Sequence, residues 1–397
     1  MINRLTGFIA VLRREAIILS KDINLISIIL LAPLFYASFY TSIYVNKSES
    51  KVPVAVMDMD RSVYSKEFIR KLDAHKIIQV NEILTDMNSI KDRIYQDDEQ
   101  SVIIIPKDFE SNIKSNRSVT IKIYLNTVRF LVSNDLNKAI NEVVQNYHKD
   151  IKMKILEMNG YSIDQAKGMY DPLRVDLRNL FNPSEAYGDF IIPGILILIL
   201  QATLLIGLSE SMAREREKNL LGELLYTANR SNSAALLGKA SFYMFFYMGY
   251  SIFYFTVIFS FFKINFAGSF FLLMLFTVIF FISIIASGIF ISSFFKKKII
   301  ALQVIAFTTY PLFFISGYIW PIQSMPAALQ NISYLIPLVP YFKSFLGITQ
   351  MGASFSDLIP PFIHLCILAV LGTILTYTRI RFLLKKEAIN PGTYIPE

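Results

Sequence analysis

Six long apolar stretches divide the chain. Each has 20 to 26 residues and contains no Asp, Glu, Lys or Arg. A helix of about 20 apolar residues crosses the roughly 30 Å hydrocarbon core of a bilayer, so the pattern predicts six transmembrane helices. They are Ile23–Val45, Phe190–Ser209, Ala240–Phe262, Phe270–Phe295, Ile299–Trp320 and Leu358–Tyr377.

The segment between the first two stretches, residues 46–189, has a different pattern, with 21 basic and 22 acidic residues. Runs rich in β-branched residues predict strands at Val52–Asp58, Ile77–Val80, Val102–Ile105 and Val119–Leu125, and amphipathic runs predict helices at Ser65–Leu72 and Asn134–Met158. Asp58, Asp60 and Ser62 suit a turn and a helix cap. The predicted fold class is therefore an α-helical polytopic membrane protein of six transmembrane helices with an inserted extracytoplasmic α/β domain.

Composition agrees with a membrane protein, and the distribution of charge predicts its orientation. Of 397 residues, 53% are hydrophobic and 18% are charged, and the net charge is +8. With the N-terminus in the cytoplasm, the inner pieces 1–22, 210–239, 296–298 and 378–397 carry 16 Lys and Arg, against two in the outer pieces 263–269 and 321–357. This bias predicts that both termini are cytoplasmic. The positive charge is then membrane-surface charge, which argues against a nucleic-acid partner.

The first 22 residues predict an amphipathic helix on the inner membrane surface. Arg4, Arg13 and Arg14 lie in other sectors than the apolar face, which consists of Leu5, Phe8, Ile9, Leu12, Ala16 and Leu19. A membrane anchor and a helix that connects to a partner both fit this pattern.

A charged run of alternating sign, Arg214-Glu215-Arg216-Glu217-Lys218, follows the second apolar stretch. An amphipathic segment with Leu220, Leu221, Leu224 and Leu225 comes next. The pattern predicts a short surface helix whose charged side chains are free to contact a soluble partner. The alternative is that these charges only anchor the end of the transmembrane helix.

Three groups of motifs resemble the ABC-2 type permeases, the membrane subunits of one class of ATP-binding-cassette exporters. The first group comprises Asn182-Pro183, Ile192-Pro193-Gly194 and the charged run with the leucine segment. It departs from the family at Thr227-Ala228, where a Thr-Pro is usual. The second runs from Gly317 through Pro321, Met325 and Pro326, and resembles the outer re-entrant segment of the family; alone, it also fits an ordinary Pro-rich loop. The third, Val54-Ala-Val-Met-Asp-Met-Asp-Arg-Ser62 with Ile103–Phe109, resembles the subgroup with a large insert, which includes bacterial multidrug-efflux permeases.

The resemblance implies a permease subunit in the bacterial inner membrane that exports a hydrophobic or amphipathic compound, drug or lipid-like. Its partners would be a second permease, identical or paralogous, two cytoplasmic ATPase subunits, a periplasmic adaptor and the lipid membrane. The residues implied to couple transport to ATP hydrolysis are Arg214, Glu215, Arg216, Glu217, Lys218, Leu220, Glu223 and Leu224. We expect charge reversal at Glu215 or Glu217 to uncouple ATPase stimulation while expression stays intact.

The chain lacks a Gly-x-x-x-x-Gly-Lys-Ser/Thr loop, so ATP and Mg²⁺ are expected on the partner ATPase, and this subunit is expected to bind no cofactor and to catalyse no reaction. With one Cys and three His, a metal centre is not expected. A receptor or scaffold that binds ligands through its outer domain is the alternative function. An intramembrane enzyme is ranked last, because the apolar stretches offer only His364 as an ionisable group near neutral pH.

Three residues are candidates for the transport pathway. Phe246 and Tyr250 belong to an aromatic-rich stretch that also fits a packed or lipid-facing helix. His364 is either a proton-linked switch or, as we favour, hydrogen-bonded to a neighbouring helix. Pro311 favours a kink in the fifth helix.

The predicted domain organisation follows from these observations. It comprises an interfacial connecting helix (1–22), the first transmembrane helix (23–45), the extracytoplasmic domain (46–189), helices two to six (190–384) with a coupling region (210–232) and a re-entrant segment (321–345), and a cytoplasmic tail (385–397) that is disordered after Lys386.

Overall fold

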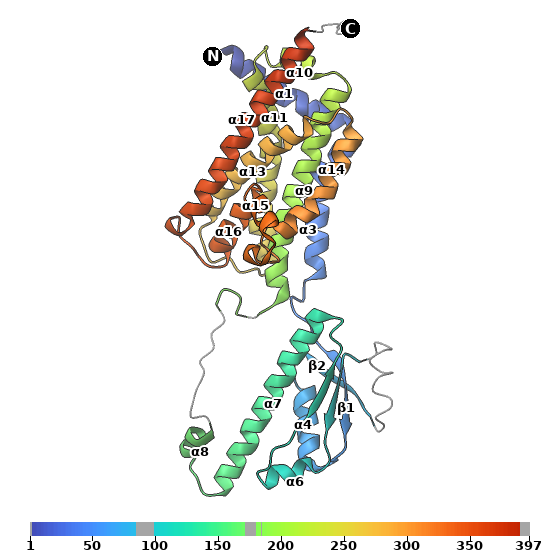
Figure 1. Cartoon of the computed structure of the whole chain (residues 1–397), viewed down its shortest axis with the longest axis vertical. Coiled ribbons are helices and arrows are strands. Elements are labelled where there is room, and N and C mark those ends of the chain that lie inside the picture. Colours follow the sequence, from blue (N-terminus) through green and yellow to red (C-terminus); the bar gives the residue numbers. More distant parts are fainter. Residues whose placement is uncertain (1, 85–98, 171–179, 184, 390–397) are drawn as a thin grey trace. The chain divides into compact units, whose positions relative to one another are not determined.

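The computed structural model describes residues 2–84, 99–170, 180–183 and 185–389 and divides the chain into two compact units. The helical unit comprises Met1–Lys47 and Asn179–Glu397, and the inserted unit comprises Ser48–Arg178 (Figure 1). The inserted unit combines a β-sheet with helices and lies in the sequence between the first and second spanning helices, which confirms the predicted fold class.

Six helices of the described residues are long and apolar enough to cross a membrane. They are Ile23–Ile43 (α2 Ile23–Ile26, η1 Ser27–Leu31, α3 Ala32–Ile43), α9 (Tyr187–Glu217), Asn232–Phe261 (α11 Asn232–Phe253, η2 Tyr254–Ile258, α12 Phe259–Phe261), α13 (Phe270–Ser292), α14 (Lys298–Ile315) and Ser356–Lys385 (η4 Ser356–Leu358 and most of α17, Ile359–Ile389). All six predicted spans are present. The second helix extends past Ser209 to Glu217. The third begins at Asn232, where the Ser231 hydroxyl caps it by accepting from the N–H of Ala234.

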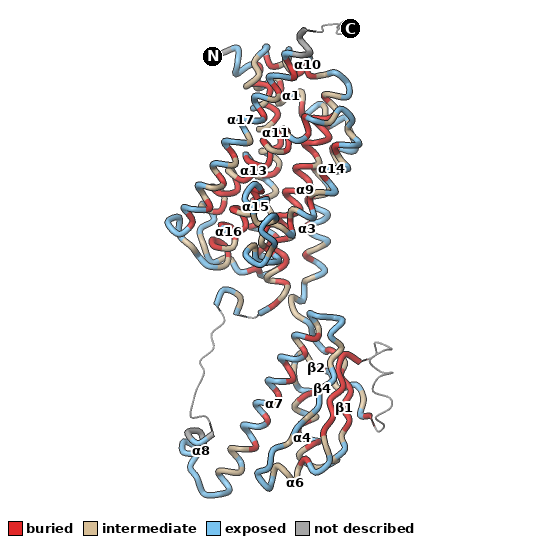
Figure 2. Tube along the Cα trace, viewed as in Figure 1, coloured by how far each residue is buried: buried red, intermediate tan, exposed pale blue. Residues whose placement is uncertain are grey.

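The central helix of this unit is α9. Its most apolar window is 83% buried, against 22–50% for the other five spans, and Figure 2 shows burial along most of its length. It packs against α3, α11, α13 and α14. The described end of α17 and the N-terminal helix α1 (Ile2–Lys21) lie at the same end of the unit, which we call the α1 end (top of Figure 1). The tail expected to be disordered is helical to Ile389, and its remainder lies outside the described residues.

The re-entrant segment predicted at 321–345 consists of short helices, η3 (Ile322–Ser324), α15 (Ala327–Ser333) and α16 (Leu338–Thr349). The last two are bent by 76° relative to each other, a geometry that fits a broken span or a re-entrant loop. Gly317, at the end of α14, has a φ of +84°, which favours glycine because a Cβ is strained there. Helix α14 continues through Pro311 to Ile315.

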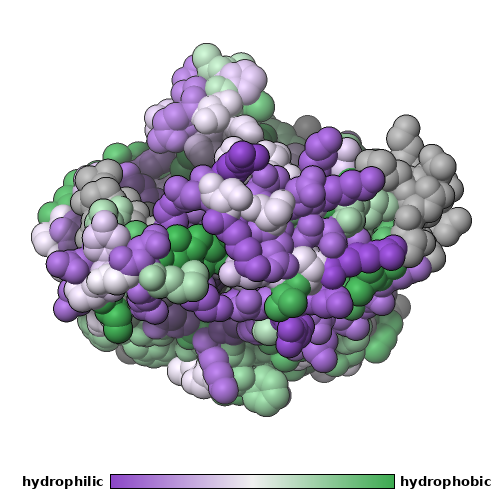
Figure 3. Space-filling model, turned by 90° about the horizontal axis from the view of Figure 1, so that it is seen from below, coloured by the Kyte–Doolittle hydropathy of each residue, from purple (hydrophilic) through white to green (hydrophobic). Residues whose placement is uncertain are grey.

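The inserted unit is a four-stranded sheet of order β2-β1-β3-β4. Its strands are β1 (Val52–Asp58), β2 (Ile78–Ile83), β3 (Ser101–Ile105) and β4 (Lys122–Leu125), and its helices are α4 (Val63–Asp73), α6 (Phe109–Lys114), α7 (Phe130–Met158) and α8 (Ile163–Tyr170). β1 is parallel to β2 and β3, and β4 is antiparallel to β3. Apolar residues of α4 and α7, such as Phe68 and Ile140, pack on Val54 and Ile103 of the sheet. The face seen in Figure 3 is mostly hydrophilic, with separate hydrophobic patches.

The predicted strands and the turn after the first strand are confirmed, except that the last strand begins at Lys122 rather than Val119. The Ser62 hydroxyl caps α4 by accepting from the N–H of Ser65. The Asp60 carboxylate accepts from the N–H groups of Phe109 and Glu110, 2.9 and 3.1 Å away, and so caps α6 from a distance of about 50 residues.

We expect Asp60→Ala to loosen α6. Hydrogen bonds to a charged group contribute about 1.5 kcal/mol or more, so amide hydrogen exchange in α6 should quicken about tenfold. Asp108→Asn is the matched control, because the Asp108 side chain makes no cap hydrogen bond although it precedes the helix. Equal exchange in the two variants would contradict the capping role.

The chain leaves and re-enters the helical unit at adjacent positions. The carbonyl of Lys47 accepts from the N–H of Gly188 at 2.9 Å, and a Cβ on Gly188 would lie 2.8 Å from the Lys47 Cα. The Lys47 ammonium donates to Asp189 at 2.5 Å and to the carbonyl of Lys263 at 2.8 Å. These contacts hold the two connections of the inserted unit side by side.

Candidate functional site

A cluster of charged side chains lies at the α1 end of the helical unit. We call it the charged junction; it consists of Arg14 and Glu15 on α1, Glu215 on α9, Glu223 on α10 (Leu221–Thr227) and Lys239 on α11. These elements meet because α1 packs on α10 and α11, and α11 packs on α9. Residues more than 200 positions apart in the sequence are thereby brought into direct contact.

Arg14 is the centre of the charged junction. Its Nη1 and Nη2 donate to the two carboxylate oxygens of Glu215 at 2.6 and 3.0 Å, and its Nε donates to Glu223 at 2.9 Å. This two-pronged geometry is the strongest ion pair that a guanidinium forms with a carboxylate. Burial alone would lower the pKa of Arg14, but the hydrogen bonds to Glu215 and Glu223 and the charges of Glu215 and Glu15 outweigh it and raise that pKa.

Lys239 completes the charged junction from α11. Its ammonium donates to Glu15 at 2.9 Å and to Glu215 at 3.3 Å, and the Ser211 hydroxyl donates to Glu15 at 3.3 Å. Glu15 and Lys239 are 1% exposed and Glu215 is 2% exposed. Water is therefore excluded, and each charge depends on its partners inside the protein.

The remaining residues of the charged run contact other elements. Arg214 donates to Asp22, before α2, at 3.0 Å. Arg216 donates to the carbonyls of Ser293 and Phe295 in the loop between α13 and α14. Glu217 accepts from the N–H of Lys298, the first residue of α14, at 2.9 Å. The run at the end of α9 thus ties together the ends of most helices that meet there.

The exposed part of this region is small. Glu217 and Lys218 are exposed, whereas Arg214 and Arg216 are half-buried. In α10, Leu221 and Leu224 are buried and Tyr226 is exposed.

Three parts of the sequence prediction for this region need correction. Glu215 is not free for a soluble partner, because it is buried and paired with Arg14 and Lys239. The predicted apolar face of α1 is not the face that packs in the unit, because Leu5 and Ile9 are exposed whereas Val11 and Glu15 are buried. Lys239 was missed as a member of this site because it directly precedes an apolar stretch, where a lysine usually marks only the end of a spanning helix. Its partners are distant in the sequence, so the only signal was a lysine and several glutamates at the predicted inner ends of different helices.

The first and second motif groups meet at Tyr318. The Asn182 amide donates to the carbonyl of Ala186, just before α9 begins, while Pro183 is exposed in the preceding turn. Pro193 and Gly194 are buried in α9, and a Cβ on Gly194 would overlap the Tyr318 ring.

The Tyr318 hydroxyl donates to the carbonyl of Phe190, and the two rings stack at 5.2 Å. Gly317 directly precedes Tyr318, whereas the remaining motif residues, Pro321, Met325 and Pro326, form the turn into α15. The Met325 carbonyl accepts from the Gln330 amide at 2.8 Å.

The pathway candidates make packing contacts. Phe246 is half-buried, with its ring 5.2 Å from that of Phe242, and the Tyr250 hydroxyl donates to the carbonyl of Leu30 at 3.3 Å. His364, on α17, hydrogen-bonds through Nε2 to the carbonyl of Tyr334 at 2.8 Å. Tyr334 is the C-cap residue of α15, so the favoured prediction for His364, a hydrogen bond to a neighbouring helix, is confirmed.

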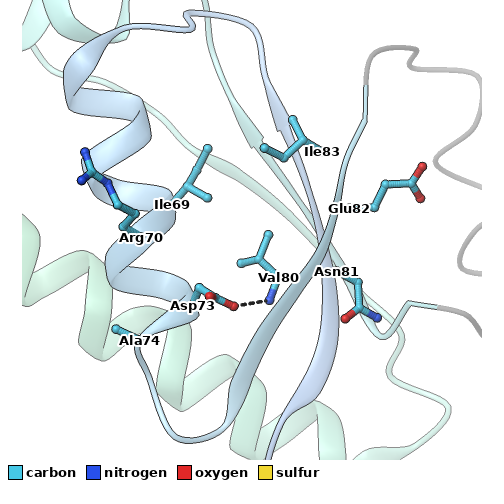
Figure 4. A pocket seen from close by; sticks show the side chains of 8 residues that line it. All are labelled: Ile69, Arg70, Asp73, Ala74, Val80, Asn81, Glu82 and Ile83. Carbon is cyan, nitrogen blue, oxygen red and sulfur yellow. Dashed lines mark hydrogen bonds between the residues drawn. The ribbon is translucent and has the colours of Figure 1, made fainter.

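A shallow pocket of about 400 Å³ lies on the inserted unit between α4 and β2. Ile69, Val80 and Ile83 give it an apolar floor, and Arg70 and Glu82 lie at its sides (Figure 4). Asp73 is engaged already, because its carboxylate accepts from the N–H of Val80 at 2.9 Å. Across the described ranges, no group of three His, Cys, Asp or Glu side chains is arranged to hold a metal ion.

Comparison with known proteins identifies the family. A family model described as ABC-2 family transporter protein matches residues 24–378. The chain belongs to this family, and it is a non-catalytic membrane subunit of an ABC transporter. The resemblance seen in its motifs is confirmed.

Two curated relatives come from Escherichia coli strain K12. One is the probable multidrug ABC transporter permease YbhR, 23% identical over 303 residues, which cover 75% of this chain and 76% of the relative. The other is the probable multidrug ABC transporter permease YbhS, 26% identical over 311 residues, which cover 76% and 77%. Both are distant relatives of this chain.

Proposed function

We propose that this permease exports hydrophobic or amphipathic compounds, drugs among them, across the bacterial inner membrane. Two distantly related permeases carry multidrug names, which supports this substrate class. The spanning helices are apolar and rich in aromatic residues, so a pathway between two such subunits would suit a greasy substrate. In this proposal the permease chain binds no cofactor, and ATP and Mg²⁺ bind to the partner ATPase.

We further propose that the ATPase subunits dock at the α1 end, on Glu217, Lys218 and the solvent-exposed side of α10. The observation that carries this proposal is the charged junction directly beneath, which joins α1, α9, α10 and α11 through paired, buried charges. A force applied to α10 would pass into three other helices through short ion pairs rather than through mobile loops. The remaining predicted coupling residues, Arg214, Arg216, Leu220 and Leu224, would hold this surface in place.

The proposed docking surface implies an orientation of the permease in the membrane, because the ATPase subunits are cytoplasmic. The α1 end, with both termini, would face the cytoplasm, and the domain predicted at 46–189 would be extracytoplasmic and accessible to a periplasmic adaptor. The excess of Lys and Arg in the inner pieces supports the same orientation.

We also propose a paralogous permease as the second membrane subunit. YbhR and YbhS are distinct permeases of one organism, and both match this chain over about three quarters of its length. Co-purification of two differently tagged copies of this chain would instead indicate a homodimer.

Reversal of one exposed charge tests the coupling proposal. We expect Glu217→Lys to reduce permease-stimulated ATP hydrolysis in the reconstituted complex about tenfold, because a like-charge contact at a docking surface costs more than 1 kcal/mol. Expression and the amount of bound ATPase at saturating concentration should be unchanged.

Glu49→Lys is the matched control, since Glu49 is exposed and lies in the inserted unit. It makes the same change of charge away from the α1 end. Equal stimulation by Glu217→Lys and wild type would refute docking at this surface. Loss of stimulation with Glu49→Lys would show a general effect of charge.

A further inference from the structure

An arginine near the end of the last helix has no carboxylate partner in the part of the chain that the structure describes. Arg379 lies within the span that ends at Lys385. Its guanidinium carbon is 4.4 Å from the ring centroid of Phe294 and 5.9 Å from that of Phe382. Its Nε is buried and has no hydrogen-bond partner among the described residues. Ring faces attract a guanidinium, but they do not neutralise it, so a half-buried guanidinium with a buried, unbonded Nε can accept an anion as partner.

The packing of α17 on α13 holds Arg379 in this position. The Thr376 hydroxyl donates to the carbonyl of Ala286 at 2.6 Å. One turn earlier, a Cβ on Gly372 would lie 3.3 Å from the Cβ of Ala286, so the two helices nearly touch. Ile380 is buried beside these contacts. The rotation of α17 is therefore fixed, which places the side chain of Arg379 on the side of Phe294.

The surroundings of Arg379 combine positive charge with exposed apolar rings. Phe294 is 54% exposed and Phe382 is 59% exposed. Four further exposed cations lie on the loop of Phe294 and on the last turns of α17: Lys296, Lys297, Arg381 and Lys385. The sequence from 359 to 386 contains no Asp or Glu.

We propose that Arg379, Phe294 and Phe382 form a binding site for the phosphate of an anionic phospholipid headgroup. The phosphate would accept from the guanidinium, whose planar fork suits phosphate oxygens, while the exposed sides of the rings contact the first methylene groups of the acyl chains. A lipid fits better than a soluble anion, because Arg379 lies two residues past the apolar stretch Leu358–Tyr377 and both rings beside it are more than half exposed. The flanking cations add attraction for a negatively charged bilayer surface.

The lipid site adjoins the charged run of α9. Arg216 binds the carbonyls on both sides of Phe294, and Glu217 accepts from the N–H at the start of α14. The end of α17 also contacts α10. A bound lipid would therefore stabilise the loop and the helix end on which the charged run depends. Lipid binding itself is a property of the permease alone and does not rest on the proposed export function.

Native mass spectrometry of the purified full-length permease in detergent, titrated with phosphatidylglycerol, tests the proposal. We expect Arg379→Gln to weaken phosphatidylglycerol binding about five- to tenfold, whereas Arg379→Lys, which keeps the charge, should weaken it about twofold. Arg381→Gln is the matched control, because Arg381 is exposed and lies on the same turn without a ring contact, and it should change binding less than twofold. Phe294→Leu, which keeps all cations, should weaken binding about threefold.

Several outcomes would overturn the site. Equal losses for Arg379→Gln and Arg381→Gln would show diffuse attraction by the basic surface. Binding of phosphatidylcholine as tight as that of phosphatidylglycerol would show that the site does not recognise the negative charge of the headgroup. Displacement of the lipid by millimolar inorganic phosphate would indicate a soluble-anion site. Unchanged lipid binding in Arg379→Gln, with loss of ATPase binding instead, would assign the arginine to a protein partner.

Discussion

Replacing Glu215 by alanine should destabilise the helical unit by about 3–5 kcal/mol, the usual cost of removing one partner from a buried ion pair. Arg14 and Lys239 would both lose a carboxylate that is 2% exposed, and no water could replace it. Unfolding in detergent can be followed by the fluorescence of Trp320, the single tryptophan, which belongs to this unit. The variant should unfold at a markedly lower temperature or denaturant concentration.

Glu217→Ala is the control for this experiment. Glu217 lies two residues further along α9 and is exposed, so its removal should cost only its hydrogen bond to the N–H of Lys298, about 1 kcal/mol as for a lost helix cap. If both variants unfold alike, the charged junction does not stabilise the unit as its geometry indicates. The result also separates stability from coupling: Glu215 variants should lose both, and Glu217 variants only coupling.

Substitution of Gly194 should have the second-largest effect. A Cβ on Gly194 would overlap the Tyr318 ring, so Gly194→Ala must displace a buried tyrosine whose hydroxyl bonds to Phe190. Overpacking of this kind costs about 1–3 kcal/mol, and the lost hydrogen bond adds about 1 kcal/mol.

The Trp320 fluorescence assay measures this loss as well, since Trp320 lies two residues from the displaced ring. Combining Gly194→Ala with Tyr318→Leu should recover part of the stability, because the smaller side chain makes room for the new methyl group. A Gly194→Ala permease that unfolds like wild type would show that the contact of the two motif groups is loose.

The sequence was sufficient to predict what depends on local pattern. Apolar length alone located six spans, and β-branched runs located the four strands of the inserted unit to within a few residues. The turn at Asp58 was predictable because Asp and Ser make their hydrogen bonds within a few residues. That Asp60 caps a helix starting at Phe109 was not, since the partner lies far along the chain.

The charged junction shows where sequence reasoning fails. Alternating charges in Arg214–Lys218 look the same whether they face water or one another, and only tertiary packing decides. Glu215 points into the unit because it forms ion pairs with Arg14 of α1 and Lys239 of α11, and neither residue is its neighbour in the sequence. Glu217, on the same helix, remains exposed. The motif resemblance singled out this run, but it could not separate buried residues from exposed ones.

The paired connections at Lys47 and Gly188 have an evolutionary consequence. The backbones at these two positions are joined directly by a hydrogen bond, so the helical unit already brings together the two chain ends between which the inserted unit lies. Any globular module whose own ends lie close together would fit there, and a tight turn would fit equally well. We therefore expect that the inserted unit of this permease could be removed or exchanged as a cassette while the helices of the helical unit stay in place.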